Sequence, residues 1–194
     1  LFDEIVFNYP IAKAVNEGWL CSIEAFMVKT KIDISGVKST AGDFNVKELS
    51  AKVDIPEKNK LIVEKYKSFG KGRQAIVFCA NIRHAENVMY MFRDEHINAA
   101  TVTSYTEHEE RKMLVEKFKM GKIDVLTNVN ILTEGFDHDD VGVIIMARPT
   151  ESLALYMQMI GRGTRLKSQT YKDVYELSHV TIIDMVDNFG NHRL

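Results

Sequence analysis

Short apolar runs alternate with helical patterns from residue 74 onward, and this alternation constrains the fold more than any other feature of the sequence. Residues 75–80 form an unbroken apolar run, which is typical of a strand covered on both faces of a sheet. Apolar residues then recur at helical spacing over 82–92, before a second strand at 99–104. Because the connections are short, the pattern predicts an α/β fold with a mainly parallel central sheet and helices on both faces.

The alternation continues toward the end of the chain. Three more strands are expected, at 123–127, 141–147 and 180–185, and a helix is expected at 152–160. Thr106 and Glu109 form a capping-box pattern, which predicts the start of another helix. Before residue 74 the pattern predicts, in chain order, a helix at 10–18, a strand within 19–31, a loop at 32–43 and a helix at 56–70.

Composition excludes several classes of protein. The chain has 194 residues, of which 45% are hydrophobic and 27% charged, and these values exclude a disordered, fibrous or coiled-coil chain. No apolar run approaches the ~18 residues of a membrane span, so no membrane partner is expected. Cys21 and Cys79 are far apart, which favours a reducing, cytoplasmic location. The cysteines and the six histidines lack metal-ligand spacing, so no metal site is expected.

Basic residues are clustered although the net charge is only −2. Six of them stand against one glutamate between positions 58 and 73, and five stand against one glutamate between 148 and 172. Such segregation indicates either an edge that faces an anion or ordinary solvated helix faces, and charge alone does not decide between them.

Ligands of parallel α/β sheets bind beyond the carboxyl ends of the strands. Four polar or glycine residues follow expected strands and are therefore predicted at this edge, namely Asn81, Ser104, Gly135 and Asp137. No glycine-rich phosphate loop, either Gly-x-x-x-x-Gly-Lys-Ser/Thr or Gly-x-Gly-x-x-Gly, is present. Gly135 allows close backbone approach and Asp137 offers a carboxylate, although a Gly-x-Asp sequence by itself indicates only a turn.

The segment 158–165 (QMIGRGTR) has two interpretations. Glycines that end a helix, with cations at its negative end, would explain it structurally. Arg162 and Arg165, three residues apart, also suit a planar, bidentate grip on phosphate oxygens. If this grip is their role, both guanidinium groups should be exposed, should lack a buried carboxylate partner and should lie about 10–15 Å or less from Asp137.

Several of these segments together resemble the second RecA-like lobe of superfamily 2 helicases. In chain order they are the strand 75–81, Glu110-Arg111, Phe118-x-x-Gly121, Thr133-Glu-Gly-Phe-Asp137 and Gln158-x-x-Gly-Arg-Gly-x-Arg165. They resemble motifs IV, V and VI, and the subgroup with the greatest similarity contains bacterial XPB-like helicases and restriction-enzyme motor subunits. The resemblance implies a RecA-like three-layer sandwich over residues 21–194, with residues 1–20 as the tail of a preceding lobe or a linker.

The resemblance implies a role for each matching residue at the nucleotide. Arg162 and Arg165 match the catalytic arginines that reach the γ-phosphate across the cleft between the lobes. Gln158, Gly135 and Asp137 match residues that bind the nucleotide, with Asp137 at a ribose hydroxyl.

Other matching positions imply contacts with the phosphates of a nucleic-acid strand. They are Asn81, Arg83, Ser104 and Thr106. Many relatives have a threonine eight residues before the motif V aspartate, where this chain has Val129, which has no side-chain donor. Asn130 or Thr133 is the expected substitute.

The resemblance implies an ATP-dependent helicase or translocase that acts on nucleic acid, with DNA as the expected substrate. ATP and Mg²⁺ are the expected cofactors. A Walker A loop and an acidic box are expected in an N-terminal RecA-like lobe before Leu1, so this chain alone is expected to be inactive. A non-catalytic RecA-like domain that binds nucleic acid or docks a partner is the alternative. A small-molecule α/β enzyme is disfavoured, because no nucleophile–base pair or glycine fingerprint follows a strand.

Overall fold

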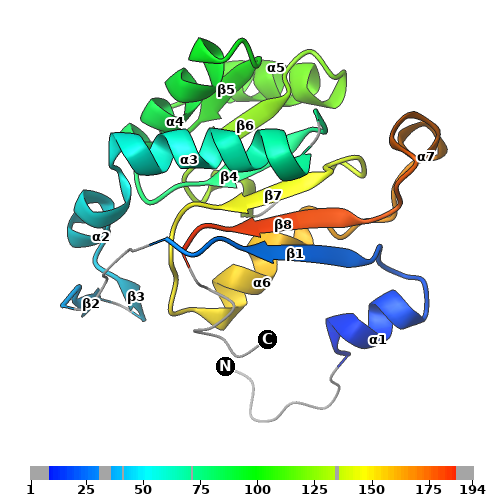
Figure 1. Ribbon diagram of the computed structural model, residues 1–194, viewed down its shortest axis with the longest axis horizontal. Helices are drawn as coiled ribbons and strands as arrows, with labels where there is room; N and C mark the ends of the chain where they lie inside the picture. Colours follow the sequence, from blue (N-terminus) through cyan, green and yellow to red (C-terminus); the bar gives the residue numbers. More distant parts are fainter. Residues whose placement is uncertain (1–8, 31–35, 41, 71, 134–135, 187–194) are drawn as a thin grey trace.

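The computed structural model describes residues 9–30, 36–40, 42–70, 72–133 and 136–186. Within these ranges the chain forms a six-stranded sheet with the order β1-β8-β7-β4-β6-β5 (Figure 1). Every neighbouring pair in this sheet is parallel. The strands are β1 (Ile23–Met27), β4 (Ala75–Phe78), β5 (Ala99–Val102), β6 (Val125–Asn128), β7 (Val143–Met146) and β8 (Val180–Asp184). A separate antiparallel pair joins β2 (Ser39–Thr40) to β3 (Asp43–Phe44).

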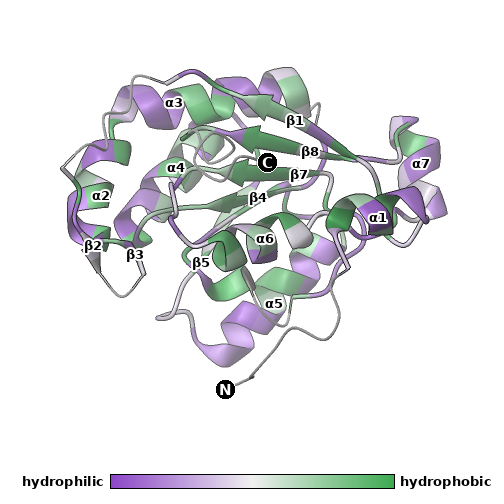
Figure 2. Ribbon diagram, turned by 90° about the horizontal axis from the view of Figure 1, so that it is seen from below, coloured by the Kyte–Doolittle hydropathy of each residue, from purple (hydrophilic) through white to green (hydrophobic). Residues whose placement is uncertain are grey.

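Helices cover both faces of the large sheet. They are α1 (Ile11–Asn16), α2 (Val46–Val53), α3 (Pro56–Lys65), α4 (Ile82–Asp94), α5 (His108–Lys119), α6 (Leu153–Gly161) and α7 (Gln169–Tyr175). A π-helical turn (Tyr66–Gly70) extends α3, and a 3₁₀ turn (Ile131–Thr133) follows β6. In Figure 2 the α6 ribbon is largely hydrophobic, whereas α5 has a wide hydrophilic face.

Successive residues of each central strand contribute to opposite hydrophobic clusters. Ala75 and Val77 of β4 pack with residues of α2, α3 and α4. Ile76 and Phe78 pack with residues of α5 and α6 on the other face. A strand that is buried on both faces must be apolar at every position, which explains the unbroken run at 75–80. The predicted three-layer α/β architecture with a parallel central sheet is confirmed.

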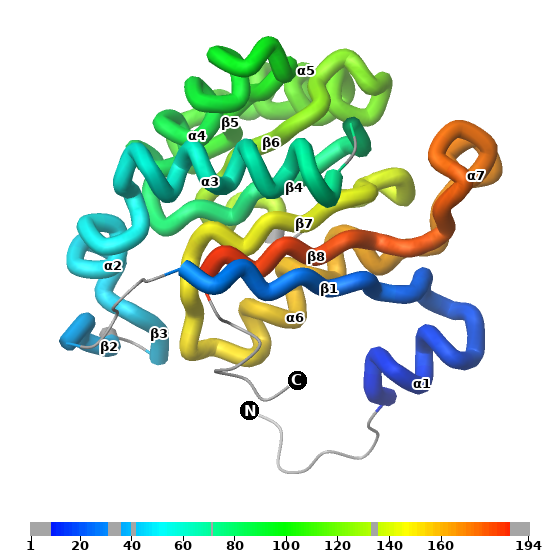
Figure 3. Tube along the Cα trace, viewed as in Figure 1, coloured from blue at the N-terminus to red at the C-terminus, as the bar shows by residue number. Residues whose placement is uncertain are grey.

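Strands from the two ends of the described chain lie side by side at one edge of the sheet (Figure 3). β1 pairs with β8 in parallel, from Ile23 opposite Val180 to Met27 opposite Asp184. The first strand therefore belongs to the same sheet as the regular β/α repeats that follow residue 74.

The segment between β1 and α3 is more structured than the sequence pattern indicates. Where a loop was expected over 32–43, β2 and β3 pair as a short hairpin. Helix α2 then follows, and the side-chain oxygen of Asn45 accepts hydrogen bonds from the backbone N–H groups of Lys47 and Glu48 at its start. Helix α2 was not predicted, and neither was α7.

The capping box at Thr106 was a wrong prediction. Helix α5 begins at His108, with Glu107 at the capping position and without a side-chain cap. The Thr106 hydroxyl instead accepts a hydrogen bond from the Thr103 backbone N–H at 2.9 Å. This local turn after β5 competes with the helix for the hydroxyl group, a common behaviour of threonine.

Among the helices of the described ranges, none is long and apolar enough to cross a lipid bilayer. Both cysteines, Cys21 and Cys79, are free and buried.

Candidate functional site

Helix α6 contains Gln158 and leads directly into the segment that carries Arg162 and Arg165, so it positions three of the predicted nucleotide-site residues. The Ser152 hydroxyl caps the helix by accepting a hydrogen bond from the Leu155 N–H at 3.2 Å. From the carboxyl end of β7 the helix runs back across the sheet, with Tyr156, Met159 and Ile160 buried beneath it. Gln158 is exposed on its outer surface. Because residues four apart share a helix face, Arg162 follows Gln158 on that surface.

The segments at 136–137 and 162–165 contact each other directly. Arg162 Nη1 donates a hydrogen bond to the carbonyl oxygen of Phe136 at 2.7 Å. Arg165 Nε lies 3.1 Å from Asp137 Oδ1, and these two side chains are 43% and 68% exposed. Phe136 itself is buried, with its ring 6.1 Å from the ring of Phe118. Two candidate motifs that are separated in sequence thus form one surface.

The exposed Arg165–Asp137 pair is suited to exchange its partner. Ion pairs at an exposed surface contribute only about 0–1 kcal/mol. A phosphate group could therefore replace Asp137 at the Arg165 guanidinium at a small cost in free energy. The prediction is confirmed for Arg165, which is exposed and whose carboxylate partner is not buried. It was wrong for Arg162, which is half-buried.

Asp137 does not lie at the carboxyl edge of the sheet, so that prediction was wrong. The adjacent His138 makes a hydrogen bond of 3.0 Å between its Nε2 and Oε1 of Gln74, the residue before β4. Because β7 runs parallel to β6, the chain between them must return along the whole sheet, and Asp137 lies near the end of that return. Asn81 and Ser104 come three and two residues after the ends of β4 and β5, at the carboxyl edge, as predicted. Gly135 lies outside the described residues.

Gly163 has a structural role, but not the helix-ending role that was expected, because the C-cap of α6 is Arg162 and neither Gly161 nor Gly163 has a positive φ. A Cβ atom at this position would lie 2.5 Å from Val180 Cγ2 and 2.9 Å from Ile144 Cγ1. The backbone after α6 therefore rests directly on β7 and β8, which only glycine permits. The close approach places Arg162 and Arg165 on the surface, so this structural role and the functional interpretation are compatible.

The predicted strand-binding residues at the carboxyl edge differ in their surroundings. Asn81 caps α4, and its Oδ1 accepts a hydrogen bond from the His84 N–H at 2.8 Å. The Arg83 side chain is 83% exposed, with Nε 4.0 Å from Asp54 Oδ2. Ser104 is exposed, and Thr106 is half-buried in its turn.

Tyr105 is a residue of this edge that sequence reasoning missed. The residue is 84% exposed and directly follows Ser104 in the sequence. Exposed aromatic rings beside polar strand ends suit stacking against nucleic-acid bases. The available signal was an aromatic residue within a polar turn, because such a turn lies at the surface and does not bury an aromatic side chain.

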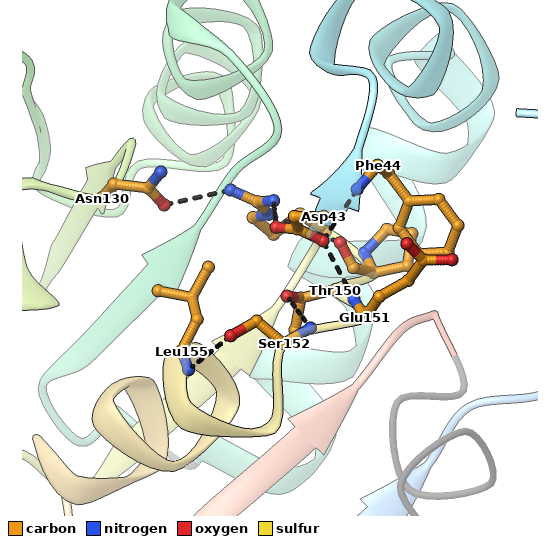
Figure 4. A network of polar contacts seen from close by, with 9 residues as sticks. Asp43, Phe44, Asn130, Thr150, Glu151, Ser152 and Leu155 are labelled. Atoms are coloured by element: carbon orange, nitrogen blue, oxygen red, sulfur yellow. Dashed lines mark hydrogen bonds and ion pairs between the residues drawn. The ribbon is translucent and has the colours of Figure 1, made fainter. Parts of the chain in front are cut away.

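Asn130 belongs to a polar network at the same edge (Figure 4). It has a left-handed backbone conformation with φ +57°, and its Oδ1 accepts a hydrogen bond from Arg148 Nη1 at 3.0 Å. Arg148 Nη2 also forms an ion pair with Asp43 of β3. Burial lowers the pKa of Arg148, and the charge of Asp43 opposes this effect. Thr133 ends the 3₁₀ turn after Asn130.

Sequence reasoning missed Arg148 and Asp43 as partners. An available signal was the charge of Arg148 directly after the fully apolar strand expected at 141–147. A charge at the end of such a strand is partly buried and requires a partner. The partner could not be identified, because Asp43 is 105 residues away in sequence.

Three cations of the two basic clusters are internal. Arg73 is buried and donates hydrogen bonds to the carbonyl oxygens of Gly70 and Phe69 and to the Thr181 hydroxyl. Lys167 Nζ donates to the carbonyl oxygens of Asp139, Val141 and Gly163. Arg148 is buried as well. These residues satisfy backbone acceptors or a carboxylate, so the anion-facing interpretation does not apply to them.

The surface formed by α6 and residues 136–137 carries hydrogen-bonding groups of the kinds that phosphate and ribose oxygens require. Arg162 and Arg165 supply planar donors, Gln158 supplies an amide and Asp137 supplies an acceptor. Within the described ranges, no group of three or more His, Cys, Asp or Glu side chains is arranged to hold a metal ion. We assign no Mg²⁺ ligand to these residues.

His84, in the first turn of α4, predicts a pH dependence of stability. Its Nδ1 accepts a hydrogen bond from the Ala80 N–H at 3.2 Å, and burial lowers its pKa from 6.5 to about 4. Between these values the unfolded chain binds a proton that the folded chain does not bind. We therefore expect the free energy of unfolding to fall by about 3 kcal/mol as the pH decreases through this window.

Urea unfolding at pH 6.5 and pH 4 measures this effect. His84→Asn keeps a hydrogen-bond acceptor but does not titrate, so its stability should change less over the same window. An equal pH dependence in the two proteins would contradict the assignment to His84.

Comparisons with known sequences identify relatives of the chain. The family described as "Helicase conserved C-terminal domain" matches residues 57–167. IRC3 of Saccharomyces cerevisiae, described as an ATP-dependent helicase, is 35% identical over 96% of this chain and 26% of its own length. The EcoKI type I restriction enzyme endonuclease subunit of Escherichia coli is 24% identical over 98% of this chain and 19% of its own length. The chain thus spans about a quarter or less of these two relatives.

Comparison with solved structures supports the fold. An HsdR subunit fragment of a type I restriction enzyme from Vibrio vulnificus YJ016 superposes with a TM-score of 0.72. It shares 22% sequence identity, and the match covers 98% of this chain and 37% of that chain.

Proposed function

Because the chain belongs to the helicase conserved C-terminal domain family, as the second RecA-like lobe of a superfamily 2 helicase, we propose that it supplies half of an ATP site and half of a strand-binding groove. The parent activity is ATP-dependent translocation or unwinding of nucleic acid. The contact of residues 136–137 with the arginines after α6 carries this proposal, because it joins two separate motifs on one exposed surface.

In this proposal Arg162 and Arg165 are the catalytic residues of the lobe. Their guanidinium groups donate to the oxygens of the γ-phosphate and neutralise the charge that shifts during phosphoryl transfer. ATP supplies the reacting phosphoryl group, and the N-terminal RecA-like lobe supplies the ligands of Mg²⁺. Gln158 binds the nucleotide, and Asp137 accepts a hydrogen bond from a ribose hydroxyl. Gly135, which is outside the described residues, is assigned to the nucleotide by its place in motif V alone.

The carboxyl edge of the sheet is the strand-binding side. Its proposed contacts are Asn81, Arg83, Ser104, Thr106, Asn130 and Thr133. Hydroxyl, amide and guanidinium donors hold phosphates without reading base sequence. Helix α6 has nine residues, which corresponds to about 13 Å of rise. The bound nucleic-acid strand therefore lies near the start of α6, and the two arginines lie at its end.

DNA is the proposed nucleic acid. The similarity to a type I restriction enzyme subunit extends over 98% of the chain, which supports a DNA motor of that kind. Residues 21–194 form the lobe, and residues 1–20 connect it to the N-terminal lobe. The partners are therefore the N-terminal RecA-like lobe and a DNA strand.

ATP hydrolysis by the whole protein tests the proposed function. Phosphate release is measured with Mg²⁺ and ATP, alone and with single-stranded DNA or RNA of equal length. DNA should stimulate hydrolysis more than RNA does. Strand binding without turnover would contradict the proposal and support a non-catalytic binding module, and equal stimulation by RNA would contradict the choice of DNA.

A further inference from the structure

We propose that Arg148 is a positioning residue for strand binding, which orients the Asn130 side chain at the carboxyl edge and is itself held by Asp43 of the β2–β3 hairpin. The inference rests on the proposed strand-binding side of the lobe. It assigns a role to a buried arginine and to a hairpin that none of the helicase motifs includes.

Arg148 joins three segments through one guanidinium group. Its side chain is only 3% exposed, at the carboxyl end of β7. Nη1 donates to Asn130 Oδ1 at 3.0 Å, and Nη2 forms the ion pair with Asp43 Oδ2. The guanidinium is a rigid fork, so fixing one nitrogen on Asp43 also fixes the direction of the other nitrogen.

Asp43 is held firmly enough to serve as the fixed end of this arrangement. Its Oδ1 accepts hydrogen bonds from the backbone N–H groups of Phe44 and Glu151, both at 2.9 Å. Glu151 immediately precedes Ser152, the cap of α6. The carboxylate thus connects the hairpin, the end of β7 and the start of α6, as Figure 4 shows.

Asn130 gains a defined orientation from this contact. The residue is exposed, and its left-handed backbone conformation places it just beyond β6. Arg148 contacts Oδ1, so the contact fixes the plane of the amide and with it the direction of the amide nitrogen, which is the other branch of the group (Figure 4). The amide –NH₂ group is a donor, which is what a phosphate oxygen requires, and the preceding Val129 has no side-chain donor.

Arg148→Lys in the whole protein separates geometry from charge. Lysine keeps the positive charge beside Asp43 but has no fork, so it cannot hold Asp43 and Asn130 together. The expected result is about a tenfold weaker affinity for single-stranded DNA, equivalent to the loss of one oriented hydrogen bond. Fluorescence anisotropy with a labelled oligothymidylate measures the dissociation constant.

Asn130→Gly provides the partner variant for a double-mutant cycle. Glycine adopts a φ of +57° without strain, so the backbone should be retained. Asn130→Gly alone should also weaken binding about tenfold, and adding Arg148→Lys should weaken it no further. This non-additivity identifies Arg148 as acting through Asn130.

Arg73→Lys is the matched control. Arg73 is also buried and uses its guanidinium fork, but it lies before β4 at the amino end of the sheet. Its replacement should lower stability without changing the dissociation constant more than about twofold. If Arg148→Lys does not fold, Asp43→Asn replaces it in the cycle, because it removes the charge and keeps an acceptor for the backbone N–H groups.

Two outcomes overturn the inference while the proposed function stands. One is that Arg148→Lys leaves DNA affinity unchanged, and the other is that it weakens binding equally with and without Asn130. If the wild-type protein itself binds no strand, the proposed function fails, and the positioning role of Arg148 fails with it.

Discussion

Replacing Arg162 or Arg165 by alanine is expected to lower ATP turnover by the whole protein about 10³-fold or more, the range observed for arginines that stabilise phosphoryl transfer. The physical reason is differential binding, because these cations matter most when charge shifts on the transferring phosphoryl group. Affinity for single-stranded DNA should change little, since both arginines lie at the far end of α6 from the carboxyl edge. Steady-state phosphate release and DNA anisotropy measure the two quantities.

Arg165→Ala tests the catalytic role more directly than Arg162→Ala does. Its pair with Asp137 is exposed, so its loss should cost little stability. Arg162 also supports the Phe136 carbonyl, so its removal can loosen the neighbouring segment. Arg93→Ala is the matched control, because this arginine donates to the Ala99 carbonyl at the amino end of β5. Equal losses of turnover and DNA affinity would make the arginines a strand clamp and support the binding-module alternative.

The 194-residue chain by itself is expected to show no ATP turnover. Its sequence has no Gly-x-x-x-x-Gly-Lys-Ser/Thr loop, and the arginine surface provides only one side of a nucleotide site. Positioning and electrostatic stabilisation supply most of the catalysis of phosphoryl transfer, and half a site supplies too little of either. Phosphate release is measured with Mg²⁺, ATP and single-stranded DNA, with the whole protein as the positive control.

The thermal unfolding of the isolated chain is measured as well. A cooperative transition shows that the chain is folded, so that a lack of turnover is not caused by unfolding. Repeated turnover by the pure chain, beyond one phosphate per molecule, would contradict the assignment of half a site to this lobe. It would also mean that residues outside motifs V and VI hold the nucleotide.

The regular part of the fold could be predicted because its signals are local. The run at 75–80 is apolar at every position, since β4 lies between two hydrophobic clusters. The helices expected at 82–92 and 152–160 have apolar faces at helical spacing, and both are present as α4 and α6. Local spacing carries this information because the helix period and the strand period differ.

Elements with weak local signals could not be predicted in this way. Helix α2 depends on Asn45 as a cap and on burial of Leu49 and Val53 beneath it. Thr106 carries a capping signal, but the turn at Thr103 takes its hydroxyl. For α2 the deciding interaction is burial against distant residues, which local spacing does not show. For Thr106 it is a local turn that competes with the helix cap for the same hydroxyl group.

The sequence by itself determined the parallel α/β class and the order of the motifs, because both depend on spacing along the chain. Only the tertiary structure decided where those motifs meet. The return of the chain to the start of β7 takes Asp137 to Arg165, away from the carboxyl edge. The pairing of Arg148 with Asp43 spans 105 residues and depends on where the β2–β3 hairpin docks. Contacts of this kind follow from strand order and chain path, which residue spacing does not encode.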